Sequence, residues 1–149
     1  MRARMSIVFR NNAALSNADL NGLFSAGGVG AGWPAWQKQL DTSDWQPVLS
    51  RSLVHVTAYS VDVDSDDARG FLVGFVNIAW DGRDHAFLVD TRVHPRFRHR
   101  NIGRDLVARA ADAARAAGCS VVHVDFSDEL TSFYRACGFV HTAAGLLRL

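Results

Sequence analysis

The chain has 149 residues, of which 48% are hydrophobic and 21% are charged, and its formal net charge is +1. This length and composition predict one folded domain spanning residues 1–149 and exclude a largely disordered protein. A net charge so near zero provides no broad basic face, so nucleic acid is not an expected partner.

The sequence carries no signal for a membrane, a secretory route or a metal. It contains no uninterrupted apolar run of about 18 residues, the length that a membrane-spanning helix needs. We therefore predict a cytoplasmic protein with no membrane partner. Cys119 and Cys137 lack metal-ligand spacing and are expected to be reduced thiols, and the histidines form no known metal motif. No metal site is predicted.

The N-terminal part is predicted to form one short strand and two helices. Residues 6–10 indicate the strand, and Ser16 is the predicted N-cap of a helix that reaches about residue 26. Glycines between residues 27 and 32 end that helix. A second helix is predicted from residue 33 to about residue 40, with Pro34 in its first turn.

The middle of the chain predicts a meander of three strands. Residues 53–63 and 71–80 are rich in β-branched and aromatic side chains, which is typical of two paired antiparallel strands. Asp81 and Gly82 form a strong hairpin signal before a third strand over residues 86–93.

A helix and a returning strand follow. Small and apolar side chains recur at helical spacing from about Gly103 to Ala117. Residues 121–126 predict a strand that returns parallel to the preceding one through a right-handed crossover. A short helix is expected over residues 128–136, and the segments 139–142 and 146–149 are either terminal strands or irregular.

The loop between the third strand and the long helix carries a dense group of cations, Arg98, Arg100 and Arg104. Backbone N–H groups in the first turn of a helix point toward an anion, and guanidinium groups nearby neutralise its charge. The loop therefore predicts a cradle for a pyrophosphate group.

Two motifs in this order resemble the GNAT family of N-acetyltransferases. One is the cationic loop, which in that family reads Arg/Gln-x-x-Gly-x-Gly/Ala, and the other is the segment Phe133-Tyr134-Arg135-Ala136-Cys137-Gly138-Phe139. Arg98, Asn101 and Gly103 occupy the fixed positions of the loop, with Asn101 in place of a glycine. Asparagine enters the left-handed backbone region more readily than other residues with a Cβ, so this departure concerns cofactor affinity rather than the fold.

The resemblance implies an α/β (α+β) fold with a mixed, mostly antiparallel central sheet and about four flanking helices. It also implies a splayed pair of parallel strands. Coenzyme A would place its pantetheine arm in the gap between them, pairing with the strand that ends at Val93. Such relatives often associate, which makes a homodimer compatible with this sequence.

The implied activity is transfer of an acetyl group from acetyl-CoA, as cosubstrate, to a primary amine of a small molecule or peptide by direct attack. The residues that the resemblance assigns to the cofactor are Val93, Arg98, His99, Arg100, Asn101, Ile102, Gly103, Arg104 and Ser127. Ser127 stands where the family has an asparagine, and it either contacts the pantetheine arm, caps the following helix, or does both.

Tyr134 matches the family's general acid, and Asp90 is the nearest candidate for a base. A phenol with a pKa of about 10 stays protonated at pH 7 and can donate to a thiolate. Deprotonating an alkylammonium at pH 7 costs about 4.6 kcal/mol, so a base is expected, yet Phe87 occupies the usual carboxylate position. Asp125 is a second candidate. A backbone N–H near Val93, at the bulged end of the strand, would stabilise the oxyanion.

Each of these roles has an alternative. Tyr134 could simply pack its ring, and Asp90 could pair with Arg92 or Arg83. The whole chain could also be a non-catalytic module that binds or senses an acyl-CoA, since Asn101 and Phe87 both depart from the family pattern.

Overall fold

The computed structural model describes residues 3–26 and 43–149. The glycine-rich segment and the second predicted helix, over residues 33–40, lie outside these ranges.

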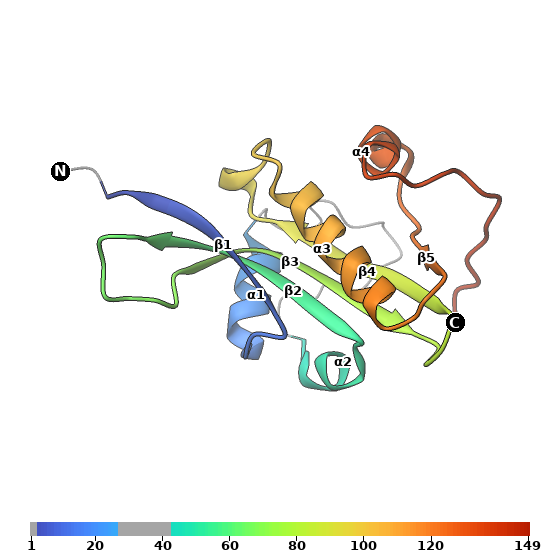
Figure 1. Ribbon diagram of the computed structural model, residues 1–149, viewed down its shortest axis with the longest axis horizontal. Helices are drawn as coiled ribbons and strands as arrows, with labels where there is room; N and C mark the ends of the chain where they lie inside the picture. Colours follow the sequence, from blue (N-terminus) through green and yellow to red (C-terminus); the bar gives the residue numbers. More distant parts are fainter. Residues whose placement is uncertain (1–2, 27–42) are drawn as a thin grey trace.

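The centre of the molecule is a twisted sheet with strands in the order β1-β2-β3-β4-β5 (Figure 1). The strands are β1 (Met5–Asn11), β2 (Val54–Asp62), β3 (Phe71–Trp80), β4 (His85–Val93) and β5 (Val121–His123). The first four pair in antiparallel fashion, whereas β4 and β5 are parallel. The predicted mixed, mostly antiparallel sheet is thus confirmed.

Four α-helices are found in the described ranges: α1 (Asn17–Ser25), α2 (Gln46–Arg51), α3 (Ile102–Ala116) and α4 (Thr131–Ala136). Ser16 caps α1 as predicted. Its hydroxyl accepts from the Asp19 N–H at 3.1 Å, and the Asp19 carboxylate accepts from the Ser16 N–H at 2.9 Å. This reciprocal pair satisfies two backbone donors that the helix itself leaves free.

Helix α2 was not predicted from the sequence. The features that favour this helix span only a few residues. The Asp44 carboxylate accepts from the Gln46 N–H at 3.1 Å, and Pro47 stands in the first turn, where its missing N–H costs nothing. Trp45, immediately before the helix, is only 2% exposed and anchors it to the core.

Strand β5 is shorter than predicted, ending at His123 rather than at residue 126. It pairs with β4 at only three positions, His85 to Phe87, so residues 124–126 continue without a strand partner. Residues 139–149 form no strand, which leaves the irregular alternative for the end of the chain.

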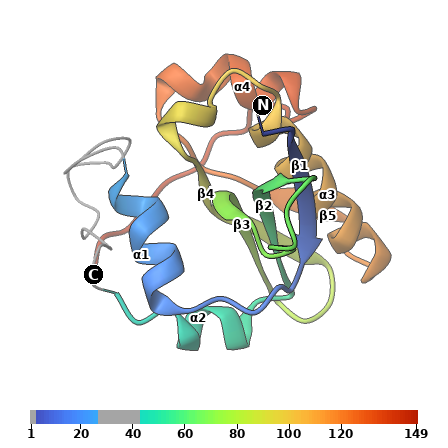
Figure 2. The same cartoon turned by 90° about the vertical axis from the view of Figure 1, so that its left-hand side faces the viewer.

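The two faces of the sheet bury separate apolar clusters. On one face α3 packs Leu106, Ala110 and Ala114 against β2 and β3. A Cβ at Gly74 would lie 2.9 Å from Leu106 Cδ1, so the absence of a side chain there allows α3 to approach the sheet. On the opposite face α1 joins Trp45 and Phe75, and Figure 2 shows α1 and α3 on either side of the strands.

None of the helices in the described part of the chain is long and apolar enough to cross a membrane.

Candidate active site where β4 and β5 diverge

Strand β4 contains a β-bulge at Asp90 and Thr91. Phe75 pairs with Arg92 but Asn77 pairs with Val89, so two residues of β4 stand opposite Val76 alone. Asp90 has a left-handed backbone with φ of 58°. The bulge therefore lies nearer the start of the strand than the expected position at Val93.

The bulge changes which side chains face each side of the sheet. Leu88 and Val93 both pack into the cluster beneath α3, although in a regular strand two residues five apart face opposite sides. The extra residue in β4 therefore places Val93 on the same face as Leu88, toward α3. It also turns Val89 and Asp90 together toward α2, where both line one cavity.

The edge of β4 beyond Phe87 is not covered by β5. The His94 N–H donates to the Val73 carbonyl at 2.7 Å, so His94 faces β3. Backbone groups alternate along a strand, and the N–H of Val93 consequently faces the opposite side, toward the gap. An extended molecule could pair with β4 there as an added strand.

The cationic loop that follows β4 has two left-handed residues, His99 with φ of 60° and Asn101 with φ of 62°. Asn101 is the N-cap of α3, and its carbonyl accepts from the Asp105 N–H at 3.0 Å, while its side chain makes no capping bond. The left-handed backbone anticipated at this glycine position is therefore present. The first N–H groups of α3 have no partner within the helix and point outward from the turn.

The side chains of the loop are open to solvent and not neutralised. Arg98, Arg100 and Arg104 are exposed, and none of them forms an ion pair within the described ranges. Partial burial, together with the positive charges of Arg96, Arg98 and Arg92, lowers the pKa of His94. This concentration of positive charge favours a dianionic group.

Gly103 joins the loop to α4. A Cβ at this position would lie 3.2 Å from two ring atoms of Phe133 and 3.6 Å from Val93 Cγ2. The first turn of α3 therefore packs directly against α4 and the end of β4. Burial raises the pKa of the Cys137 thiol, and Arg104, on the same turn, lies near enough to offset part of that rise.

Tyr134 lies on α4 and is 6% exposed. Its ring packs against Phe126, Phe133 and Phe139, with centroids 4.7, 4.9 and 5.7 Å away. Burial raises the pKa of the phenol, and the charge of Asp125 adds to the rise, so the hydroxyl remains protonated at neutral pH. Packing in the core, one of the two expectations for this residue, is thus observed.

Thr91 is a polar neighbour of Tyr134 that the sequence reasoning missed. Its hydroxyl partly offsets the raised pKa of Tyr134, which places the two groups close together. Yet Thr91 Oγ1 is buried and forms no hydrogen bond of proper geometry within the described part of the chain. The Thr91 hydroxyl thus lies enclosed at the bulge, beside the Tyr134 phenol.

Asp90 faces the other side of the sheet. It lines a cavity of about 310 Å³ with Asn77, Ala79, Val89 and α2. Burial raises the pKa of Asp90, and an interaction with the Asn77 side chain partly offsets the rise. The alternative role in an ion pair is not observed, because within the described ranges Asp90 forms no salt bridge with Arg92 or Arg83.

Phe87 belongs to an aromatic cluster with His85 and His123 that the sequence analysis did not predict. Parallel pairing puts Phe87 opposite His123, and their rings stack with centroids 4.8 Å apart. His85 Nδ1 lies 2.8 Å from His123 Nε2. No cluster of three or more metal-binding side chains occurs in the part of the chain that the structure describes.

Ser127 begins a short 3-10 helix, Asp128–Leu130, with an extended backbone at the cap position. Its hydroxyl makes no capping hydrogen bond, although its carbonyl accepts from the Leu130 N–H at 2.9 Å. The alternative in which the Ser127 side chain caps the following helix is therefore not observed, and its exposed hydroxyl makes no hydrogen bond to the 3-10 helix.

A bulged strand with an open edge, a left-handed cationic turn and a buried tyrosine are thus assembled at one end of the sheet. A family model described as the acetyltransferase (GNAT) family matches residues 31–139. The chain belongs to this family.

A relative described as an N-acetyltransferase matches part of the chain. The uncharacterized N-acetyltransferase ycf52 of Pyropia yezoensis is 26% identical over 84 residues, which are 56% of this chain and 48% of that protein. The match thus spans about half the length of that relative.

Solved structures of acetyltransferases show the same fold over almost the whole chain. A GNAT-family protein of Streptococcus pneumoniae TIGR4 is 21% identical, with a TM-score of 0.70 over 97% of this chain and 98% of that one. The aminoglycoside N-acetyltransferase AAC(6')-Iy in complex with CoA is also 21% identical, with a TM-score of 0.64 over 100% and 96% of the two chains.

Proposed function

We propose that this protein transfers an acetyl group from acetyl-CoA to a primary amine of a small molecule or peptide by direct attack. The observation that carries the proposal is the bulge in β4. It places Asp90 on the α2 face and Thr91, beside Tyr134, on the α3 face. The candidate base, Asp90, thus lies on one side of the strand, and the candidate acid, Tyr134 beside Thr91, lies on the other.

The cofactor would be held by the loop and the open edge of β4. Acetyl-CoA supplies an activated thioester and an anionic diphosphate. The first N–H groups of α3 and the side chains of Arg98, Arg100 and Arg104 would receive the diphosphate, with His99, Asn101, Ile102 and Gly103 shaping the turn. The N–H of Val93 and the hydroxyl of Ser127 would then bind the pantetheine arm from two sides.

Tyr134 would donate the proton that the departing thiolate needs. Its raised pKa keeps the phenol protonated at neutral pH, and its ring is fixed by three aromatic neighbours. The hydroxyl therefore has a defined position without a competing carboxylate bond. General acids of this kind contribute about 10²- to 10⁴-fold to a rate.

Asp90 would accept a proton from the attacking amine. Its raised pKa makes it a stronger base than an exposed aspartate, and the cavity beside it is lined by apolar groups of α2, β3 and β4 together with Arg51 and Asn77. The amine would enter from the α2 face, opposite the cofactor. Backbone N–H groups at the bulge, which no strand of the described sheet pairs beyond Phe87, would stabilise the developing oxyanion.

An assay that follows thiol release from acetyl-CoA with a panel of amines tests this function. Turnover with at least one amine is expected, and Asp90→Asn should reduce it while Asp112→Asn, an exposed carboxylate on α3, should not. Turnover that is unaffected by changes at both Tyr134 and Asp90 would contradict the proposed roles.

The second candidate is a non-catalytic module that binds an acyl-CoA. It is favoured by Phe87, whose ring stacks on His123 at the usual carboxylate position. This candidate predicts that acetyl-CoA binds with the same loop requirement, but that no amine in the panel releases thiol. Such a result would replace the first proposal.

A further inference from the structure

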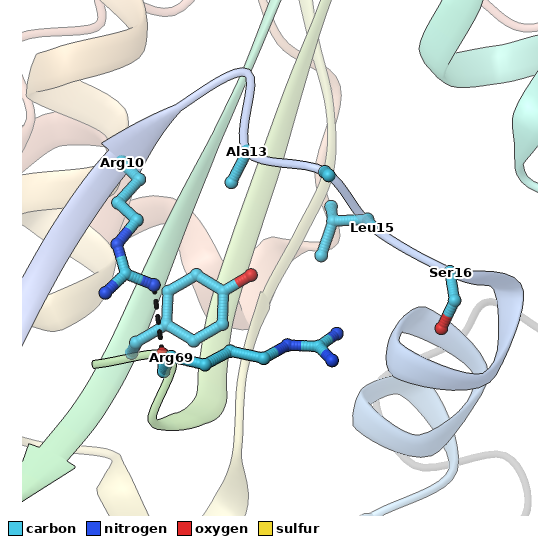
Figure 3. Close-up of a pocket in the computed structure, with 7 residues that line it drawn as sticks. Arg10, Ala13, Leu15, Ser16 and Arg69 are labelled. Atoms are coloured by element: carbon cyan, nitrogen blue, oxygen red, sulfur yellow. Dashed lines mark hydrogen bonds between the residues drawn. The ribbon is translucent and has the colours of Figure 1, made fainter. Parts of the chain in front are cut away.

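A second cavity lies on the other side of the molecule from the open edge of β4. It has a volume of about 470 Å³ and lies between the end of β1, the start of α1 and the turn after β2. Figure 3 shows Arg10 and Arg69 reaching into the same space as Leu15 and Ser16. Strand β3 separates this region from β4, so it does not share the candidate active site.

The side chain of Arg10 is fixed but retains unused donors. It donates to the carbonyl oxygens of Ala68 at 2.6 Å and Arg69 at 2.9 Å. A guanidinium carries five N–H donors, so three are left without a partner in the described part of the chain. Its carbon lies 4.5 Å from the centroid of the Tyr59 ring, and this stacking holds the group flat.

Arg69 brings a second positive charge, which is only partly neutralised. Its guanidinium contacts the Asp19 carboxylate at 2.7 Å through one nitrogen. The same carboxylate oxygen also accepts from the Ser16 N–H, so it is shared between two donors. Two guanidinium groups therefore face the cavity, with the Asp19 carboxylate on Arg69 and the Asp67 carboxylate accepting from the Arg69 N–H nearby.

Tyr59 adds a third donor to the cavity. Its ring lines the cavity and is largely buried, while its hydroxyl is not enclosed and forms no hydrogen bond within the described ranges, so it can donate to a bound molecule. The rest of the lining is apolar, from Ala13 to Leu15.

We propose that this cavity binds a small molecule with one carboxylate and an adjoining apolar group. A planar carboxylate matches the fork of a guanidinium, and the hydroxyl of Tyr59 can donate to the same group. A carboxylate brings a single negative charge, whereas a phosphate would bring about 1.5 to 2 negative charges beside Asp19 and Asp67. The apolar group would lie on Ala13 and Leu15.

Benzoate is a suitable probe, and NMR titration of the amide signals at constant ionic strength can locate its binding. Saturable shifts are expected at residues 13–16 and around Arg69, with benzamide binding at least about tenfold more weakly because it lacks the charge. Benzamide binding equal to that of benzoate, or benzoate shifts that do not saturate, would overturn the proposal. Inorganic phosphate binding here more tightly than benzoate would overturn the choice of a carboxylate.

Two variants with a matched control test the named residues. Arg69→Gln and Tyr59→Phe should each weaken benzoate binding about tenfold, the latter keeping the ring that supports Arg10. Arg83→Gln, an exposed arginine after β3, should leave the binding constant unchanged. Unchanged binding in both Arg69→Gln and Tyr59→Phe would overturn the site.

This inference stands apart from the proposed activity. Arg98→Gln should weaken CoA but leave benzoate binding intact. Loss of benzoate binding in Arg98→Gln would instead assign the anion to the cofactor loop and overturn the second site.

Discussion

The two faces of β4 offer different chemistry at adjacent residues. On the α3 face, Thr91 and Tyr134 are neutral hydroxyl groups among aromatic rings, and the cationic turn lies nearby. On the α2 face, Asp90 is a carboxyl group in a small cavity that Asn77 and Arg51 also line. One extra residue in the strand produces this arrangement, because it puts Asp90 on the α2 face beside Val89 and Thr91 on the α3 face, the reverse of what regular alternation from Leu88 would give. A proton donor and a proton acceptor can thereby lie close without neutralising each other.

The largest effect is expected from Tyr134→Phe, which removes the acid on the α3 face. The ring and its aromatic contacts remain, so the fold and acetyl-CoA affinity should be unchanged. Turnover should fall by about 10²-fold or more, since a general acid contributes that much. Steady-state kinetics and direct acetyl-CoA titration separate the two effects. Equal loss of affinity and turnover would show that Tyr134 acts through packing.

Asp90→Asn tests the α2 face and should lower turnover by about 10²-fold. Burial raises the pKa of Asp90, so the folded protein holds this proton to higher pH than the unfolded chain does. The ionised carboxylate therefore opposes folding as pH rises above its ordinary value of 3.8. The variant should consequently be more stable than the wild type at pH 7, as measured by urea unfolding.

A paired loss of turnover and gain of stability identifies Asp90 as a functional carboxylate rather than a structural one. Asp112→Asn, on the exposed face of α3, should leave stability within about 0.5 kcal/mol. Lower stability of Asp90→Asn at pH 7 would contradict this account of the α2 face.

Gly103→Ala tests how closely the first turn of α3 packs against α4. The new Cβ would lie 3.2 Å from the Phe133 ring and would displace it, next to Tyr134. Unfolding free energy should fall by about 1–3 kcal/mol, the usual range for overpacking. Gly22→Ala is the matched control, since no atom lies within 4 Å of its Cβ position in α1. That change should stabilise the protein by about 0.5–1 kcal/mol.

Asn101→Gly should have the smallest effect. Glycine relieves the left-handed backbone at φ of 62° without changing the charge of the turn. Coenzyme A affinity should rise by at most about 1 kcal/mol, because asparagine already tolerates this conformation. Calorimetric titration measures the change. A large loss of affinity would instead show that the Asn101 side chain itself binds the cofactor.

The α3 face could be predicted from sequence because its signals are local. Arg98, Asn101 and Gly103 lie within one turn, and Tyr134 sits in a recognisable short segment. The helix start and the left-handed position follow from neighbouring residues, and both are present in the structure.

The α2 face depends on contacts between residues far apart in the chain. The bulge arises from pairing of β4 with β3, and nothing near Asp90 in sequence marks it. Helix α2 lacks a long apolar period because it has only six residues, and Trp45 anchors it through tertiary packing. The contact of Thr91 with Tyr134 and the stacking of Phe87 on His123 also come from strand register.

A crystal structure with acetyl-CoA and an inhibitory amine tests the central claim most directly. We predict the diphosphate at the first turn of α3, the sulfur beside the Tyr134 hydroxyl, and the amine on the Asp90 side of β4. A cofactor bound away from that turn, or an amine on the same side as Tyr134, would contradict the assignment of the two faces.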